Sequence, residues 1–205
     1  MDPLFTYHSI SEPAEGLYKE KGSRFIAYAF PVNNEEKIKE YLQQLRKKHF
    51  DARHHCYAFR LGADGKHYRA NDDQEPAGSA GKPIHGQLLS FNVTNILLVV
   101  VRYFGGTKLG VGGLIQAYKA AAEDCLNHAS INEYPIEKSI HCEFPYEKYN
   151  EVMKHLRDCQ FRDHTQRIDE QCVLEGTIPL KNESSLIQKF ERLSGLTYRI
   201  EEYQP

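Results

Sequence analysis

The segment Ile96–Leu114, ILLVVVRYFGGTKLGVGGL, predicts a buried strand, a glycine-rich loop and the start of a helix. Its first six residues, 96–101, are all apolar, which is typical of a central strand covered on both faces. Five glycines follow within nine positions, at 105, 106, 110, 112 and 113. Because glycine loses more backbone entropy on folding than other residues, such a loop implies positive φ angles or a close backbone approach. A helical pattern begins near Gly110.

The polar residues of this loop leave three interpretations open. Arg102, Tyr103, Phe104 and Lys108 suit an anionic or aromatic partner. The N–H groups at the start of the helix, together with Lys108, would suit a phosphate. However, the loop has neither the GxxxxGK[ST] nor the GxGxxG spacing of the standard nucleotide motifs. A binding surface and a tight strand-to-helix corner therefore remain the main alternatives.

Composition narrows the class of protein. The formal net charge of −2 over 205 residues gives no overall attraction for nucleic acid, so any such contact requires a local patch. Five scattered cysteines without a CxxC pair favour free thiols over a disulfide framework or a zinc site. The longest apolar run is too short to span a membrane, and MDPLFTYHSI lacks the pattern of a secretory signal. We expect a cytoplasmic protein without a metal or cofactor.

The chain is predicted to hold two domains of an α+β protein, residues 1–134 and 135–205, with Pro135 closing the preceding helix. In the second domain the apolar periodicity predicts strand 136–144, helix 149–156, a hairpin of 161–168 and 171–180, helix 186–193 and strand 196–200. This βαββαβ order is the ferredoxin-like arrangement. The first domain reads as a strand region 17–30 with a turn at 21–23, helix 38–45, strands 52–61 and 67–70, helix 84–91, strand 96–104 and helix 110–128.

The polar loop 71–83, NDDQEPAGSAGKP, carries three carboxylates, Asp72, Asp73 and Glu75. Asp72 and Asp73 could hold a hard cation such as Mg²⁺. The favoured alternative is a solvated acidic loop whose Ser79 caps the next helix.

The sequence His54-His55-Cys56 raises a catalytic alternative. Adjacent strand residues point to opposite faces, so the two histidines cannot share one ion, whereas His54 and Cys56 share a face. A Cys–His nucleophile would require a hydrogen bond between the two side chains. Ser79 with a histidine and Asp72 supplies hydrolase residue types, but no GxSxG elbow accompanies them. A buried structural cysteine is favoured.

Basic residues are distributed along the first domain rather than clustered. The sheet could nevertheless bring several to one rim beside the aromatic residues Phe25, Tyr103 and Phe104; these are Arg24, Arg53, Lys82, Arg102 and Lys108. Such a surface would suit single-stranded RNA, through attraction to the phosphates and stacking on the bases. Ordinary solvated charge is the alternative.

Four motifs in order give the chain a resemblance to the IMPACT family, bacterial YigZ type: Lys21-Gly22-Ser23-Arg24-Phe25, Ala52–Cys56, the loop 72–83 and Arg102–Leu114. The resemblance implies a first domain like domain 2 of ribosomal protein S5 and a second like domains III and V of elongation factor G. It also implies a role in translation, since eukaryotic relatives bind the activator of an initiation-factor kinase. Two residues depart from the family pattern: Gln74 stands where glycine is usual, and Gln116 where a basic residue is common.

The resulting prediction is a non-enzymatic, translation-associated regulator that binds RNA, the ribosome or a translation factor. Arg102 and Lys108 would pair with phosphate or acidic groups, Tyr103 or Phe104 would stack, and Asp72, Asp73 and Glu75 would order the loop. Arg24, His54 and Lys82 complete the predicted binding residues. The alternative is a small hydrolase or nucleotide-using enzyme built on His54 and the loop 72–83.

Overall fold

The computed structural model describes residues 4–202, apart from the side chains of residues 163 and 164, as an α+β protein of two compact units. One unit consists of residues 7–134 and the other of residues 135–202 with 4–6. Each unit has its own antiparallel sheet and its own core. Within residues 4–202, no helix is both long and apolar enough to cross a membrane.

The first unit is built on a five-stranded sheet. Its strands are β2 (Ala14–Glu20), β3 (Ser23–Pro31), β4 (His54–Leu61), β5 (His67–Asn71) and β6 (Ile96–Tyr103). They lie in the order β2-β3-β6-β4-β5, and every neighbouring pair is antiparallel. The apolar strand that the sequence places at the centre of the sheet is the central strand.

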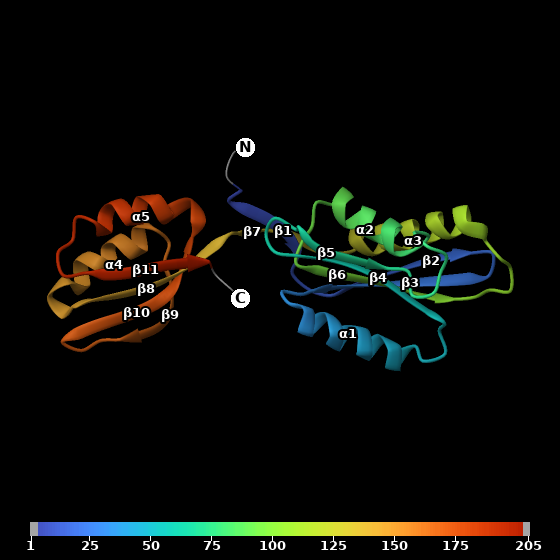
Figure 1. Cartoon of the computed structure of the whole chain (residues 1–205), viewed down its shortest axis with the longest axis horizontal. Coiled ribbons are helices and arrows are strands. Elements are labelled where there is room, and N and C mark those ends of the chain that lie inside the picture. The colour runs from blue at the N-terminus through green and yellow to red at the C-terminus, as the bar shows by residue number, and fades with distance from the viewer. Residues whose placement is uncertain (1–3, 203–205) are drawn as a thin grey trace. The chain divides into compact units, whose positions relative to one another are not determined.

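Helices cover both faces of this sheet. Helix α1 (Glu35–Lys48) lies on one face, and α2 (Gly81–Ser90) and α3 (Gly110–Asn127) lie on the other (Figure 1). Because side chains alternate along a strand, β6 supplies both cores. Leu97, Val99 and Val101 join the core under α1, whereas Ile96, Leu98 and Val100 join the core under α2 and α3. The run 96–101 is continuously apolar because helices cover both faces of the sheet at this strand.

Two short strands complete this unit and correct the sequence prediction. Strand β7 (Ile131–Pro135) pairs with β1 (Thr6–Ile10) in a separate two-stranded sheet. Pro135 was predicted to close the preceding helix, but α3 already ends at Asn127, and Pro135 ends β7 instead. The two strands have only five residues each, and their buried and exposed residues do not alternate, so they give no periodicity by which the sequence would reveal them.

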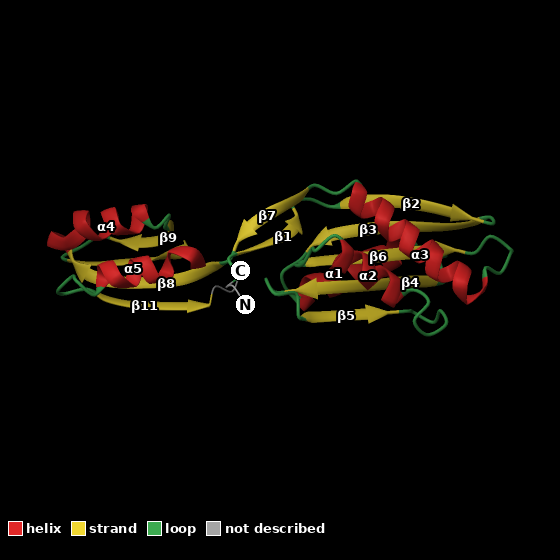
Figure 2. Ribbon diagram, turned by 90° about the horizontal axis from the view of Figure 1, so that it is seen from above, coloured by secondary structure: helices red, strands yellow, loops and turns green. Residues whose placement is uncertain are grey.

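The second unit follows the element order that its periodicity predicts. The order is β8 (Glu137–Pro145), α4 (Tyr149–Asp158), β9 (Arg162–Arg167), β10 (Gln171–Pro179), α5 (Glu183–Phe190) and β11 (Thr197–Glu202), with short 3₁₀ turns η1 (Tyr146–Lys148) and η2 (Leu180–Asn182). The strands lie in the order β11-β8-β10-β9, and both helices pack on one face (Figure 2). This is a β-α-β-β-α-β arrangement.

The register of the first sheet brings distant motifs together at one end. Arg24, near the start of β3, pairs with Tyr103 at the end of β6, and His54 at the start of β4 pairs with Arg102. The turn between β2 and β3, the connection from α1 to β4 and the segment from β6 to α3 all lie at this end, on the right in Figure 1.

Candidate functional site

The glycine-rich segment is a tight corner at its beginning. The amide of Gly105 donates to Ser23 Oγ over 3.1 Å. A Cβ atom at Gly105 would lie 1.9 Å from the carbonyl carbon of Gly22, so only glycine fits against the β2–β3 turn. Gly106 and Gly110 have φ angles of +88° and +69°, which glycine adopts at little cost.

Gly112 has a different environment from the other glycines of the segment. It lies in the first turn of α3 without a positive φ, and apart from its chain neighbours and the local helix backbone no atom lies within 4 Å of the position of a Cβ. Glycine in a helix costs about 1 kcal/mol relative to alanine. The chain's own packing does not require this glycine, and the outer side of the α3 N-terminus is left open.

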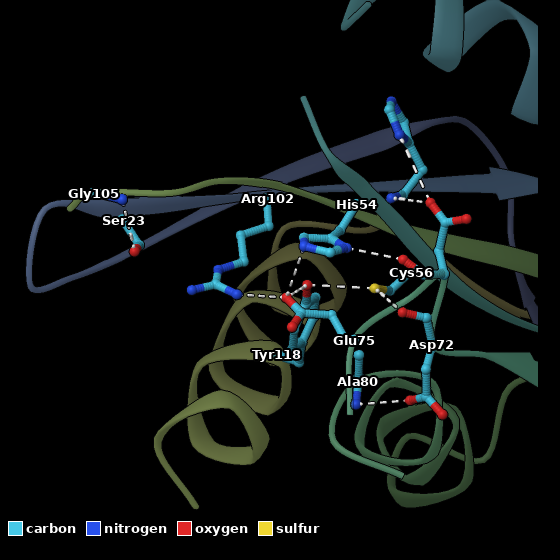
Figure 3. A network of polar contacts seen from close by, with 11 residues as sticks. Ser23, His54, Cys56, Asp72, Glu75, Ala80, Arg102, Gly105 and Tyr118 are labelled. Atoms are coloured by element: carbon cyan, nitrogen blue, oxygen red, sulfur yellow. Dashed lines mark hydrogen bonds and ion pairs between the residues drawn. The ribbon is translucent and has the colours of Figure 1, made fainter. Parts of the chain in front are cut away.

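Behind the corner lies a buried polar network centred on Glu75 (Figure 3). Arg102 Nη1 donates to Glu75 Oε1 over 2.6 Å, and the Tyr118 hydroxyl donates to the same oxygen over 2.8 Å. The side chains of Arg102 and Glu75 are only 9% and 4% exposed. Burial raises the pKa of Tyr118, so its hydroxyl keeps its proton and remains a donor.

Arg102 lies inside the protein, although the sequence predicts that it pairs with phosphate or acidic groups of a partner. Its guanidinium is held inside by Glu75 and lies 5.5 and 5.7 Å from the ring centres of Phe25 and Phe104. Its Nε is buried without a hydrogen-bond partner. Arg102 therefore neutralises a buried carboxylate and does not present its charge to an outside phosphate.

Asp72 holds the start of helix α2. Its carboxylate accepts the amides of Gly78, Ala80 and Gly81 over 2.8–2.9 Å. Burial raises the pKa of Asp72, but these three N–H groups outweigh burial and leave its pKa below the ordinary value. The prediction that Ser79 caps this helix is wrong, because the N-cap residue is Ala80 and Ser79 Oγ is buried without a partner.

Asp73 and Gln74 form a strained turn. The Asp73 carboxylate accepts from Arg46 Nη2 over 3.1 Å and from the His55 amide over 2.7 Å. Asp73 and Gln74 have φ angles of +40° and +71°, so Gln74 adopts the conformation that glycine, usual here in the resembled family, adopts most readily.

The three acidic residues of this loop thus have separate internal partners, and the expectation of a solvated acidic loop is wrong. Among the side chains that the structure describes, which are those of residues 4–162 and 165–202, no group of three or more His, Cys, Asp or Glu is placed to hold a metal ion.

His54 and Cys56 share a face of β4, as the sequence predicts. His54 Nδ1 lies 2.9 Å from the Asp73 carbonyl and therefore carries the proton, while its Nε2 lies 3.9 Å from Glu75 Oε1. The Cys56 thiol donates to the Asp72 carbonyl over 3.0 Å. Burial raises the pKa of Cys56, so the thiolate that a nucleophile requires is disfavoured.

Tyr103 lies on the opposite face from Arg102 and ends a chain of hydrogen bonds. Its hydroxyl donates to Asp51 Oδ1 over 3.0 Å and therefore accepts from His49 Nδ1 at 2.9 Å. His49 Nε2 then accepts from the Tyr28 hydroxyl, also at 2.9 Å. Burial lowers the pKa of His49, in keeping with a neutral ring. The Arg24 guanidinium covers the Tyr103 ring at 4.9 Å.

Exposed basic and aromatic side chains remain around this end of the sheet. We call this surface the strand-end rim and define it as Lys21, Arg24, Phe50, Arg53, Phe104 and Lys108, all of them exposed. Lys82 is also exposed, in the first turn of α2. Among the side chains that the structure describes, none of the five basic groups is within ion-pair distance of a carboxylate. The predicted binding residues therefore divide into a buried network and an exposed surface.

Sequence reasoning missed several residues of this region. Tyr118 lies among helix positions with apolar spacing, and nothing in the sequence shows that its hydroxyl meets a carboxylate. His49, Phe50 and Asp51 follow the charged end of α1 and carry no recognisable motif. The pairing of β3, β4 and β6 brings His49 and Asp51 to Tyr103, and the packing of α3 on the sheet brings Tyr118 to Glu75.

Fold and site define an α+β protein with a glycine corner between its central strand and its long helix. A family model, the Impact N-terminal domain, matches residues 21–126, from the β2–β3 turn to the end of α3. The IMPACT family member YvyE of Bacillus subtilis is 35% identical over 158 residues, 77% of this chain and 73% of the relative. The chain belongs to the IMPACT family.

Other relatives agree with this assignment. The IMPACT family member YigZ of Escherichia coli is 41% identical over 136 residues, 64% of this chain and 67% of that protein. Protein IMPACT of Oryctolagus cuniculus is 34% identical over 95 residues, which cover 44% of this chain and 30% of that protein. A crystal structure of a hypothetical protein superposes with a TM-score of 0.73 at 28% identity and covers 98% of both chains.

Proposed function

We propose that this protein is a non-enzymatic, translation-associated factor that binds RNA through the strand-end rim. The observation that carries the proposal is a set of exposed cations at the same end of the sheet as Phe104, namely Lys21, Arg24, Arg53 and Lys108, which have no carboxylate partner among the described side chains. Such cations release counterions from phosphates, and an exposed aromatic ring offers a stacking surface.

The proposal extends to the two domains and their setting. A first domain like domain 2 of ribosomal protein S5, and a second like domains III and V of elongation factor G, would suit contact with ribosomal RNA in the cytoplasm. This part of the proposal is an analogy of fold. The strand-end rim supports it independently, because its charge distribution depends on this chain's own residues.

The chemistry of the buried network supports binding rather than catalysis. Cys56 is buried with a raised pKa, and the carboxylates of Asp72, Asp73 and Glu75 are each engaged by internal donors. A hydrolase or nucleotide-using enzyme would require some of these groups to be free. Nucleotides with Mg²⁺ should therefore leave the melting temperature unchanged, since a ligand of the native state raises it by mass action.

Lys108→Ala tests the proposal, with Lys39→Ala as the matched control. Lys39 is exposed on α1, nine residues before the end of that helix, and loses the same charge. We expect Lys108→Ala to weaken binding of a labelled single-stranded RNA several-fold and Lys39→Ala to leave it unchanged. Equal affinities of the wild-type protein and both variants would contradict the proposal. Binding of a translation factor in the absence of any RNA binding would favour the protein-partner alternative.

A further inference from the structure

We propose that Phe50 and Phe104 are two stacking positions for unpaired bases of single-stranded RNA, an inference that rests on the proposed function. Phe50 is 84% exposed and Phe104 is 54% exposed. Single exposed apolar residues are common on protein surfaces and require no explanation. These two, however, belong to segments that are hydrogen-bonded to each other at the strand-end rim, through His49, Asp51 and Tyr103.

Phe50 lies in a turn anchored on both sides. The Ala52 amide donates to the His49 carbonyl over 3.0 Å and closes the turn. The neighbours of Phe50 in the chain, His49 and Asp51, are both hydrogen-bonded to the Tyr103 hydroxyl. The backbone that carries Phe50 is thereby fixed against the end of β6 while its ring stays in solvent.

Phe104 approaches the end of β6 from the other face. It follows Tyr103 directly, and its ring centre lies 5.7 Å from the guanidinium carbon of Arg102, which is itself held by Glu75. Arg102 and Tyr103 point to opposite faces of the sheet. The two phenylalanines therefore flank the strand end, one on the side of His49 and one on the side of Arg102.

Charge determines which ligand suits this pair of rings. Lys21, Arg24, Arg53 and Lys108 are exposed at the same end of the sheet. Glu20 and Asp51, which lie in the adjoining segments, each accept from a tyrosine hydroxyl, whereas Asp73 and Glu75 are held by internal donors. In a nucleic acid strand, the phosphates would pair with these cations and the bases would stack on the phenylalanine rings. In a duplex the bases are stacked inside the helix and are out of reach, so the arrangement favours a single strand.

Phe50→Ala and Phe50→Trp in the full chain test this inference. The sequence contains no tryptophan, so Phe50→Trp introduces a single fluorescent reporter at the proposed stacking position. We expect single-stranded RNA to quench this fluorescence. Phe50→Ala should weaken binding of single-stranded RNA roughly 5- to 150-fold. Its salt dependence should match the wild type, because no charge is removed.

Tyr146→Trp and Tyr146→Ala are the matched controls, since Tyr146 is 58% exposed in the second unit. We expect neither quenching nor loss of affinity there. If wild-type protein binds RNA but Phe50→Ala binds equally well and Phe50→Trp is not quenched, this inference is overturned while the proposed function stands. Equal losses on single-stranded and duplex RNA would also overturn it. Failure of the wild-type protein to bind RNA would remove both proposals.

Discussion

At the scale of single residues, the glycines of one glycine-rich segment differ in whether the packing of the chain requires them. A Cβ at Gly105 would overlap the backbone of Gly22, whereas a Cβ at Gly112 would meet nothing beyond the local helix backbone. The sequence shows that the glycines of this loop cost backbone entropy. It cannot show which of them the packing requires, because the contact that requires Gly105 comes from a residue 82 positions away.

This contrast gives a paired prediction. Gly105→Ala should lower the free energy of unfolding by about 1–3 kcal/mol or more, because the new methyl group overlaps backbone atoms that cannot easily move. Gly112→Ala should raise it by about 1 kcal/mol through helix propensity. Urea denaturation measures both changes. A destabilised Gly112→Ala variant would contradict the finding that there is space for a Cβ at Gly112 in the first turn of α3.

The buried pair of Glu75 and Arg102 gives a second prediction. Glu75→Leu and Arg102→Met should each destabilise the protein by about 3–5 kcal/mol, since each leaves an uncompensated charge in the interior. The double variant should cost much less than the sum of the two, because both charges are then gone. Strictly additive losses in a double-mutant cycle would mean that the two side chains do not compensate each other.

At the scale of elements, the sequence predicts the segments that have a clear apolar periodicity. It does not predict a helix end that is stabilised by a side chain from elsewhere in the chain. The apolar run of β6 and the spacing of α1 predict those elements directly. The start of α2, however, was predicted at residue 84 and lies at Gly81, because Asp72 supplies the acceptor that the predicted cap Ser79 does not. A cap that comes from nine residues upstream lies outside the local pattern by which helix starts are recognised.

Asp72→Asn should therefore destabilise the first unit by about 1–3 kcal/mol at neutral pH, since three amides lose a charged acceptor. The pKa of Asp72 is lowered in the folded state, so its contribution is complete above the unfolded value and is lost as the pH falls through the folded one. The difference between variant and wild type should shrink on acidification below about pH 4. Urea midpoints measured across that range report it, and a difference independent of pH would contradict the assigned role.

At the scale of the whole molecule, the two units should respond to pH in opposite directions. Burial lowers the pKa of His49, His55 and His85 in the first unit, so their contribution is lost as the pH falls below about 6.5. In the second unit, hydrogen bonds to Glu143 and Glu175 raise the pKa of His141. That contribution is present below about pH 6.5 and is lost as the pH rises through the folded value.

Amide hydrogen exchange, corrected for the intrinsic effect of pH, can follow the two units separately. Between pH 8 and about 5.5, protection should fall in residues 7–134 and rise around β8 and β10. His141→Gln should abolish the rise without changing the fall. A parallel loss of protection in both units would contradict this assignment of the histidines.

The candidate site was only partly predictable from the sequence. The segments of the four motifs contact one another in the first unit, and the shared face of His54 and Cys56 follows from strand geometry. The role of Arg102 could not be foreseen, because an arginine next to a glycine loop has the same sequence whether its charge meets solvent or a buried Glu75. Phe50 and its anchoring by Tyr103 depend on contacts between segments about 50 residues apart.

The most direct test of the RNA-binding rim is the salt dependence of single-stranded RNA binding. If four cations of the strand-end rim contact phosphates, the logarithm of the association constant should fall with the logarithm of salt concentration with a slope of about −3. Lys108→Ala should make that slope shallower by about 0.7, and Lys39→Ala should leave it unchanged. An affinity that does not fall as salt is raised, with the same slope in all three proteins, would contradict the account.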